Sequence, residues 1–230
     1  MKVLIIVTNS AVYENSNLPT GLWLSELTHF YDSAKEQAYE ITIASPQGGP
    51  TPIDPESVKP MMLDKLSKEY YTNENFMKLL QKTESLTEIA EQHFDVVYLT
   101  GGHGTMFDFP NNTTLQDIIR VHYENNKIVS AVCHGVGGLL NVRLSNGEYL
   151  IKGKTITGFN WIEESIARRK KEVPFNLEAE LKKRGSNYKK AFIPMTSKVV
   201  ADGHLITGQN PFSSKEIAKA VMQYLKKRAL

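Results

Sequence analysis

The stretch VSAVCHGVGG, residues 129–138, contains the only cysteine of this 230-residue sequence, Cys133, and a histidine directly after it. A thiol beside an imidazole can act as a nucleophile, because the imidazole can take the thiol proton. An apolar run ends at Val132, so we expect Cys133 on a strand-to-helix turn at the carboxyl edge of a sheet, where open α/β sheets place their sites. N–H groups at a helix start favour the thiolate there. A buried structural cysteine is the alternative interpretation.

A second glycine-rich turn, LTGGHGT at residues 99–105, follows the preceding apolar run. That run is expected beside the strand before Cys133, so both turns should open at the same sheet edge. The backbone N–H groups of Gly102, next to Gly101, and of His134 could then stabilise a developing oxyanion. The Lys-Ser/Thr ending of a phosphate loop is absent. The alternative for this segment is an ordinary turn without a function. The alternative for His134 is a side chain at the start of the helix that faces solvent.

Glu26 lies in PTGLWLSELTHF, residues 19–30, where we expect a helix to begin after the turn. Leu22, Glu26 and Phe30 follow one another at a spacing of four, which places Glu26 on the apolar stripe of that helix. A carboxyl group there should be desolvated, with a raised pKa that leaves it protonated near neutrality. It could then donate a hydrogen bond to a thiolate or move a proton. A glutamate that reaches solvent from the edge of the stripe is the alternative.

Short β-rich apolar runs alternate with helical patterns, which predicts an α/β fold with a mostly parallel sheet. The runs predicted as strands are 2–7, 39–45, 94–100, 127–132 and 154–159, followed by a hairpin over 198–208 that turns at Asp202-Gly203. The predicted helices are 21–37, 112–126, 134–141, 160–169, 175–184 and a last one from Ser213 to about Lys227. Residues 46–92 begin with prolines and glycines and continue as a polar helical stretch, which predicts a small helical cap inserted in one domain spanning 1–230.

The net charge of +2, from 27 basic and 25 acidic residues, gives no support for a nucleic-acid partner. No run approaches the ~18 apolar residues of a membrane span. The opening segment 2–7 is better interpreted as a first buried strand than as the core of a signal peptide. One cysteine cannot form an internal disulfide, which fits a reducing compartment, and we expect a cytoplasmic protein.

The motifs LTGGHGT, AVCHG, TGF and LITGQNPFSS, in this order and with the PTG…E opening, resemble the ThiJ/PfpI superfamily of class I glutamine-amidotransferase-like proteins. The resemblance implies a flavodoxin-like three-layer sandwich. It extends to the branch of glutathione-independent glyoxalase III enzymes and holding chaperones, which carries an inserted cap. For this branch it implies a nucleophile at Cys133, a partner at His134, a glutamate beside the sulfur at Glu26 and a third triad member at Glu164, with Glu163 left open.

The implied reaction converts methylglyoxal, a small aldehyde, to lactate without glutathione, metal or organic cofactor, and relatives imply a homodimer. The thiolate of Cys133 would add to the aldehyde carbon, Glu26 or His134 would move a proton to the next carbon through an enediol, and water would release the hydroxy acid. Val136 departs from the proline that the family usually has after CHG. A His-x-Glu pair is absent around His204, which disfavours a glutamine amidotransferase.

Two other functions stay open from the sequence. A holding chaperone would use adaptable apolar surface, and methionines and phenylalanines occur at residues 60–92. A redox sensor would oxidise Cys133 to a sulfinate stabilised by Glu26. A reactive cysteine serves the enzyme and the sensor equally, so the residue pattern does not separate them.

Overall fold

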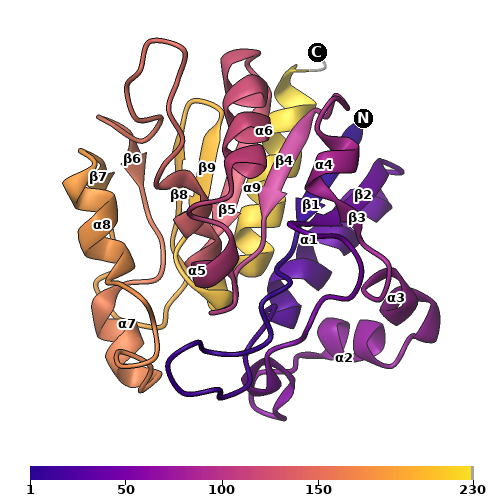
Figure 1. Cartoon of the computed structure of the whole chain (residues 1–230). Coiled ribbons are helices and arrows are strands. Elements are labelled where there is room, and N and C mark those ends of the chain that lie inside the picture. The colour runs from indigo at the N-terminus through magenta and orange to yellow at the C-terminus, as the bar shows by residue number, and fades with distance from the viewer. Residues whose placement is uncertain (229–230) are drawn as a thin grey trace.

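Seven strands form one sheet, in the order β3-β2-β1-β4-β5-β9-β8, in the computed structural model, which describes residues 1–228 (Figure 1). All neighbouring pairs are parallel except the β8–β9 hairpin. The predicted mostly parallel sheet is therefore confirmed. The bounds of the strands are β1 Lys2–Ile6, β2 Glu40–Ser45, β3 Glu84–Ser85, β4 Val96–Leu99, β5 Ile128–Val132, β8 Val199–Asp202 and β9 Leu205–Gly208.

The central strands are apolar on both faces because helices cover the sheet from both sides (Figure 1). In β1, for example, Leu4 and Ile6 pack into one helical layer, and Val3 and Ile5 pack into the other. The first layer contains α4 (Leu86–Ile89), α5 (Thr105–Asp108), α6 (Thr113–Glu124) and α8 (Leu177–Lys183). The second contains α1 (Leu24–Glu36) and α9 (Ser214–Arg228). This is the three-layer sandwich that the resemblance implied.

The prediction of a sheet strand at 154–159 is wrong. Only β6 (Thr155–Ile156) forms there, and it pairs with β7 (Asn187–Tyr188) in a separate two-stranded sheet. The physical reason is that the β8–β9 hairpin takes the place beside β5, where this segment would have joined the parallel sheet. The chain instead runs on to Asn160, which caps the short helix α7 (Trp161–Ile166).

The segment 46–92 contains a 3₁₀ turn, η1 (Pro55–Val58), and the helices α2 (Lys65–Tyr71) and α3 (Glu74–Leu79) before it returns to the sheet as β3 and α4. Helix α2 packs against α1, where Thr28 Oγ1 and Ser67 Oγ are 2.8 Å apart. In Figure 1, α2 and α3 project beside the lower edge of the sheet. A further 3₁₀ turn, η3 (Pro211–Ser213), precedes α9.

Within residues 1–228 we find no helix with both the length and the apolar character needed to cross a membrane.

Candidate active site

Cys133 lies where β5 ends and the 3₁₀ helix η2 (Cys133–Leu139) begins. Its φ of 57° puts a non-glycine residue in the left-handed region, which is a strained conformation. A strained strand-to-helix turn of this kind presents a nucleophile at the edge of an α/β sheet. The Cys133 side chain is held in a nearly closed space, because the residue is only 2% exposed.

The imidazole of His134 lies between the thiol and a carboxyl group. Its Nδ1 is 3.3 Å from Cys133 Sγ, and its Nε2 is 2.9 Å from Glu164 Oε2. An ionised carboxylate can only accept hydrogen bonds, so Nε2 of His134 donates and its Nδ1 is left as an acceptor. The thiol proton of Cys133 therefore faces a basic nitrogen.

Glu163, the neighbour that the sequence left open, points elsewhere. Its Oε2 accepts the backbone N–H of Asn160 at 3.2 Å, which completes a capping box at the start of α7. Its Oε1 accepts three hydrogen bonds from another part of the chain: Gln209 Nε2 at 2.7 Å, Asn210 Nδ2 at 2.7 Å and Met195 N at 2.8 Å. Glu163 thus ties α7 to the end of β9, whereas Glu164 is the one that contacts His134.

Glu26 is fully buried on the first turn of α1, beside the Cys133 side chain. Its Oε2 accepts the backbone N–H of Gly101 at 2.7 Å. A Cβ at Gly101 would lie 2.5 Å from that oxygen and 2.8 Å from the Cβ of Cys133, so the close approach requires glycine. Because Oε2 is used in this way, a proton on Glu26 belongs on Oε1, which is buried without an ordinary hydrogen-bond partner.

Burial acts on both members of the Glu26 and Cys133 pair. It raises the pKa of Glu26 from 4.5 to about 8, against the lowering effects of the Cys133 side chain and the Gly101 N–H. Burial, followed by the charge of Glu26, also raises the pKa of the Cys133 thiol. The prediction of a protonated Glu26 therefore agrees with the structure. The prediction of a resting thiolate does not, because burial outweighs the helix-start N–H of His134.

His103 is the side chain that the sequence analysis missed. Its Nε2 lies 2.8 Å from Glu164 Oε1, so one carboxylate holds two imidazoles. Burial alone would raise the pKa of Glu164, but the charge of His134 and the hydrogen bonds from both histidines hold it well below its usual range. His103 stands inside the motif LTGGHGT, directly after β4. The sequence shows the histidine in that turn, but it does not show the pairing with Glu164.

Ligand atoms of His103, His134 and Glu164 lie within 4.8 Å of one another, and two imidazoles with a carboxylate are a donor set that Zn²⁺ accepts. In this chain, however, Glu164 uses one oxygen for each histidine. The Nε2 nitrogens of both histidines are therefore committed to hydrogen bonds with this carboxylate. We interpret the cluster as a hydrogen-bonded relay.

The two backbone groups expected to bind an oxyanion sit on neighbouring turns. Gly102 has φ of 103°, and a Cβ there would lie 2.1 Å from Gly21 O, so only glycine fits. Its N–H has no acceptor among residues 1–228. The backbone N–H of His134 interacts with the sulfur of Cys133. Both groups thus remain candidates for a new anion beside the thiol.

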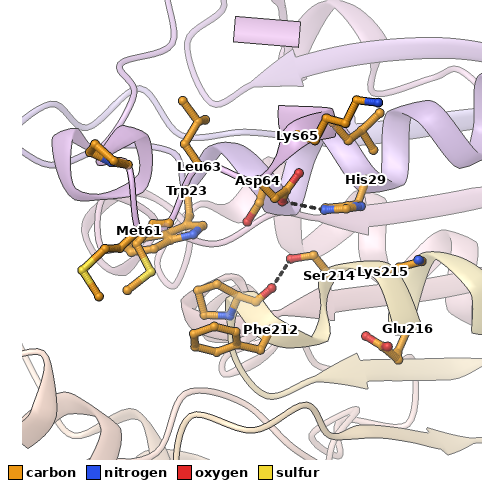
Figure 2. A pocket seen from close by; sticks show the side chains of 15 residues that line it. Trp23, His29, Met61, Leu63, Asp64, Lys65, Phe212, Ser214, Lys215 and Glu216 are labelled. Atoms are coloured by element: carbon orange, nitrogen blue, oxygen red, sulfur yellow. Dashed lines mark hydrogen bonds and ion pairs between the residues drawn. The ribbon is translucent and has the colours of Figure 1, made fainter. Parts of the chain in front are cut away.

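A separate groove of about 570 Å³ runs between the start of α1, the residues before α2 and the start of α9 (Figure 2). Trp23, Met61 and Phe212 supply apolar walls, and the His29–Asp64 pair lies at one side. The catalytic candidates Cys133, His134, Glu26 and Glu164 are not among the residues that line it. The groove is therefore not the reaction chamber.

Comparisons with known proteins place this chain in a family. The DJ-1/PfpI family model matches residues 18–224. Glyoxalase 3 of Candida albicans is 33% identical over 230 residues, covering 96% of this chain and 97% of that protein. The glutathione-independent glyoxalase HSP31 of Saccharomyces cerevisiae is 30% identical over 235 residues, covering 98% of each. The crystal structure of glyoxalase III from Candida albicans has a TM-score of 0.88 at 33% identity, over 97% of this chain and 96% of that one. The family resemblance found in the sequence is confirmed: the chain belongs to the DJ-1/PfpI family.

Proposed function

We propose that this chain is a glutathione-independent glyoxalase, which converts methylglyoxal and similar α-oxoaldehydes to 2-hydroxy acids such as lactate. The nearly full-length relationship to proteins named glyoxalases supports the reaction. One geometric observation supports this chemistry at Cys133. Its Sγ lies 3.3 Å from Nδ1 of His134, and Glu164 hydrogen bonds to the other nitrogen of that ring. A thiol, a base and an orienting carboxylate in this order are the parts of an activated nucleophile.

In the first step, His134 Nδ1 takes the thiol proton while Cys133 Sγ attacks the aldehyde carbon. The product is a hemithioacetal, with the former carbonyl oxygen negative. The N–H groups of Gly102 and His134 are the proposed donors to that oxygen. Glu164 stabilises the imidazolium that forms, since its carboxylate is ionised and in direct contact with the ring.

The second stage is an internal redox change that needs no cofactor. The proton on the aldehyde carbon moves to the neighbouring carbon through an enediol, and the His134 imidazolium gives its proton to the former ketone oxygen. These two transfers turn the hemithioacetal into a thioester of the hydroxy acid. Water then attacks the thioester, the C–S bond breaks, and the thiol recovers its proton. One water is consumed in each turnover, and the atoms of methylglyoxal and water together make lactate.

The enclosure of the site supports a small substrate. Cys133 is 2% exposed, and the side chains of His134 and Glu164 are 2% and 5% exposed. Only a compact molecule can reach the sulfur without a rearrangement of the surrounding chain.

The family relationship further supports a homodimer in the cytoplasm. Sedimentation velocity tests the oligomeric state, and fractionation of cells that express the tagged protein tests the location.

A redox sensor is the second candidate, and one observation favours it. Glu26 Oε1 is buried beside the sulfur without an ordinary hydrogen-bond partner. A protonated Oε1 could donate to an oxygen of a Cys133 sulfinate. Mass spectrometry after graded peroxide treatment would support this function if Cys133 formed a stable sulfinate faster than the protein lost its fold. A thiol inert to peroxide would exclude it.

The test of the proposed enzyme is lactate formation from methylglyoxal in the absence of glutathione. Wild-type protein should produce lactate, and Cys133→Ala should produce none above the uncatalysed rate. The exposed His93 lies away from the site, and His93→Gln is a suitable control that should retain full turnover. No turnover by the folded wild type would reject the proposal.

A further inference from the structure

The carboxylate of Glu164 is shared equally between two imidazoles. Oε2 pairs with His134 Nε2 at 2.9 Å, and Oε1 pairs with His103 Nε2 at 2.8 Å. The two rings lie side by side, with centroids 4.0 Å apart and planes inclined by 40°. A single orienting carboxylate would suffice for a Cys–His–Glu triad, so the second imidazole calls for its own explanation.

The shared carboxylate fixes the tautomer of both rings. Glu164 is ionised and can only accept, so each Nε2 carries the hydrogen and each Nδ1 carries a lone pair. For His134, that lone pair faces the sulfur of Cys133. For His103, the same constraint leaves a second basic nitrogen, on a ring whose centroid is 4.0 Å from that of His134.

The basic nitrogen of His103 is partly exposed and has no hydrogen-bond partner in the part of the chain that the structure describes. Among residues 1–228, His103 Nδ1 has no hydrogen-bond partner. The atom is nevertheless not fully enclosed, in contrast to Glu26 Oε1, which is buried without an ordinary hydrogen-bond partner among the same residues. The side chain as a whole is 7% exposed. Nδ1 is thus a partly exposed base without a hydrogen-bond partner among residues 1–228, on a ring that packs against that of His134.

The other two candidate bases are occupied when the hemithioacetal has formed. His134 already holds the thiol proton and is an imidazolium against Glu164. Glu26 carries its own proton near neutrality, because burial raises its pKa to about 8. Burial, followed by the charge of His134, lowers the pKa of His103, so the second ring stays neutral beside the first.

We propose that His103 is a catalytic base of this site, whose Nδ1 takes the proton from the former aldehyde carbon of the Cys133 hemithioacetal and returns it to the neighbouring carbon. The inference rests on the proposed glyoxalase function. When the C–H bond breaks, its electron pair forms the C=C bond of the enediol, and the former ketone oxygen takes the thiol proton from the His134 imidazolium and becomes an enediol hydroxyl. In the return step, the same proton forms the new C–H bond, and the sulfur-bearing carbon becomes the thioester carbonyl. His103 ends the cycle neutral.

His103→Gln is the informative variant, because a glutamine amide can still donate to Glu164 from near the Nε2 position but has no basic nitrogen. We expect lactate turnover to fall by about 10²–10⁴-fold. Alkylation of Cys133 by iodoacetamide should keep its wild-type rate, since His134 and Glu164 are untouched. With methylglyoxal deuterated at the aldehyde carbon, the primary isotope effect on the remaining turnover should be larger than in the wild type.

Controls separate the ways in which the inference can fail. His29→Gln, in the groove of Figure 2, removes a histidine that also pairs with a carboxylate, and it should leave turnover unchanged. Full activity of His103→Gln, or an equal loss of turnover and Cys133 alkylation in a folded variant, would overturn the inference and leave the glyoxalase function standing. If His103→Gln failed to fold, the same measurements on His103→Asn would decide by the same criteria. A wild type that makes no lactate would overturn the function and the inference together.

Discussion

His134 Nδ1 lies 3.3 Å from the Sγ of Cys133, although the two residues are consecutive in the chain. Consecutive side chains ordinarily diverge. Here the positive φ of Cys133 turns the backbone sharply at the end of β5, and the 3₁₀ helix that follows keeps the imidazole on the side of the sulfur. The backbone strain at Cys133 is thus directly connected to the contact that we propose activates the thiol.

Glu164→Gln should reduce lactate turnover by about 10²–10⁴-fold, because it removes the charge that stabilises the His134 imidazolium. Alkylation of Cys133 should slow as well, since the tautomer of His134 is no longer fixed. Glu163→Gln is the matched control, one residue away. It should lower the melting temperature, because Glu163 joins α7 to Gln209 and Asn210, but it should keep kcat near the wild-type value. The reverse pattern would assign the third position to Glu163.

Gly101→Ala should abolish turnover and lower the free energy of unfolding by about 1–3 kcal/mol. The added Cβ would lie 2.5 Å from Glu26 Oε2 and 2.8 Å from the Cβ of Cys133, so both side chains must move. Gly137→Ala provides the comparison, because its nearest neighbour would be an ordinary 3.7 Å away and its φ is not positive. Steady-state kinetics and urea denaturation measure both effects. A fully active Gly101→Ala variant would show that the distance between Glu26 and the sulfur is unimportant.

The buried Glu26 should make the protein less stable as the pH rises from about 4.5 to about 8. Its pKa in the folded state is about 8, against an ordinary value of 4.5, so the folded state binds this proton more tightly than the unfolded state does. The stabilisation is complete below the ordinary pKa and is lost through this range, to an extent on the order of 4–5 kcal/mol. Urea denaturation across this range should show a flatter pH dependence for Glu26→Gln than for the wild type. Identical slopes would contradict a protonated Glu26.

Removal of metal ions should leave turnover unchanged. Both carboxylate oxygens of Glu164 hydrogen bond to the Nε2 atoms of His103 and His134, and the proposed reaction passes only protons among these groups. Protein dialysed against EDTA should therefore retain its kcat, with the untreated sample as the reference. A loss of activity that stoichiometric Zn²⁺ restores would replace the hydrogen-bonded relay with a metal centre.

Much of the layered fold follows from the apolar pattern alone. Buried parallel strands need apolar residues on both faces, so the runs around Val3, Val97 and Val129 were distinctive. The segment at 154–159 has similar composition but only two residues of it pair, and with β7 rather than with the central sheet. Strand pairing depends on which edges are still free, and a local pattern does not contain that information.

Part of the candidate site could also be predicted from the sequence, and part of it could not. The locations of Cys133 and Gly102 could be predicted because both follow apolar strands that end at one sheet edge. Glu26 could be predicted because a carboxyl stands on an apolar helical stripe. The place of His103 in the site could not be predicted, since it depends on a contact with Glu164, which lies 61 residues further along the chain. The raised pKa of Cys133 also depends on burial from several elements together, which outweighs the effect of the local helix start.

The most direct test of the account is to look for the covalent intermediate on Cys133. Wild-type protein mixed with a slight excess of methylglyoxal, quenched in acid within the first turnover and analysed by intact and peptide mass spectrometry, should carry one methylglyoxal unit on Cys133. Cys133→Ala should carry none and should make no lactate. Lactate production by Cys133→Ala, or wild-type turnover with no adduct at any quench time, would contradict the central claim that this single thiol is the nucleophile.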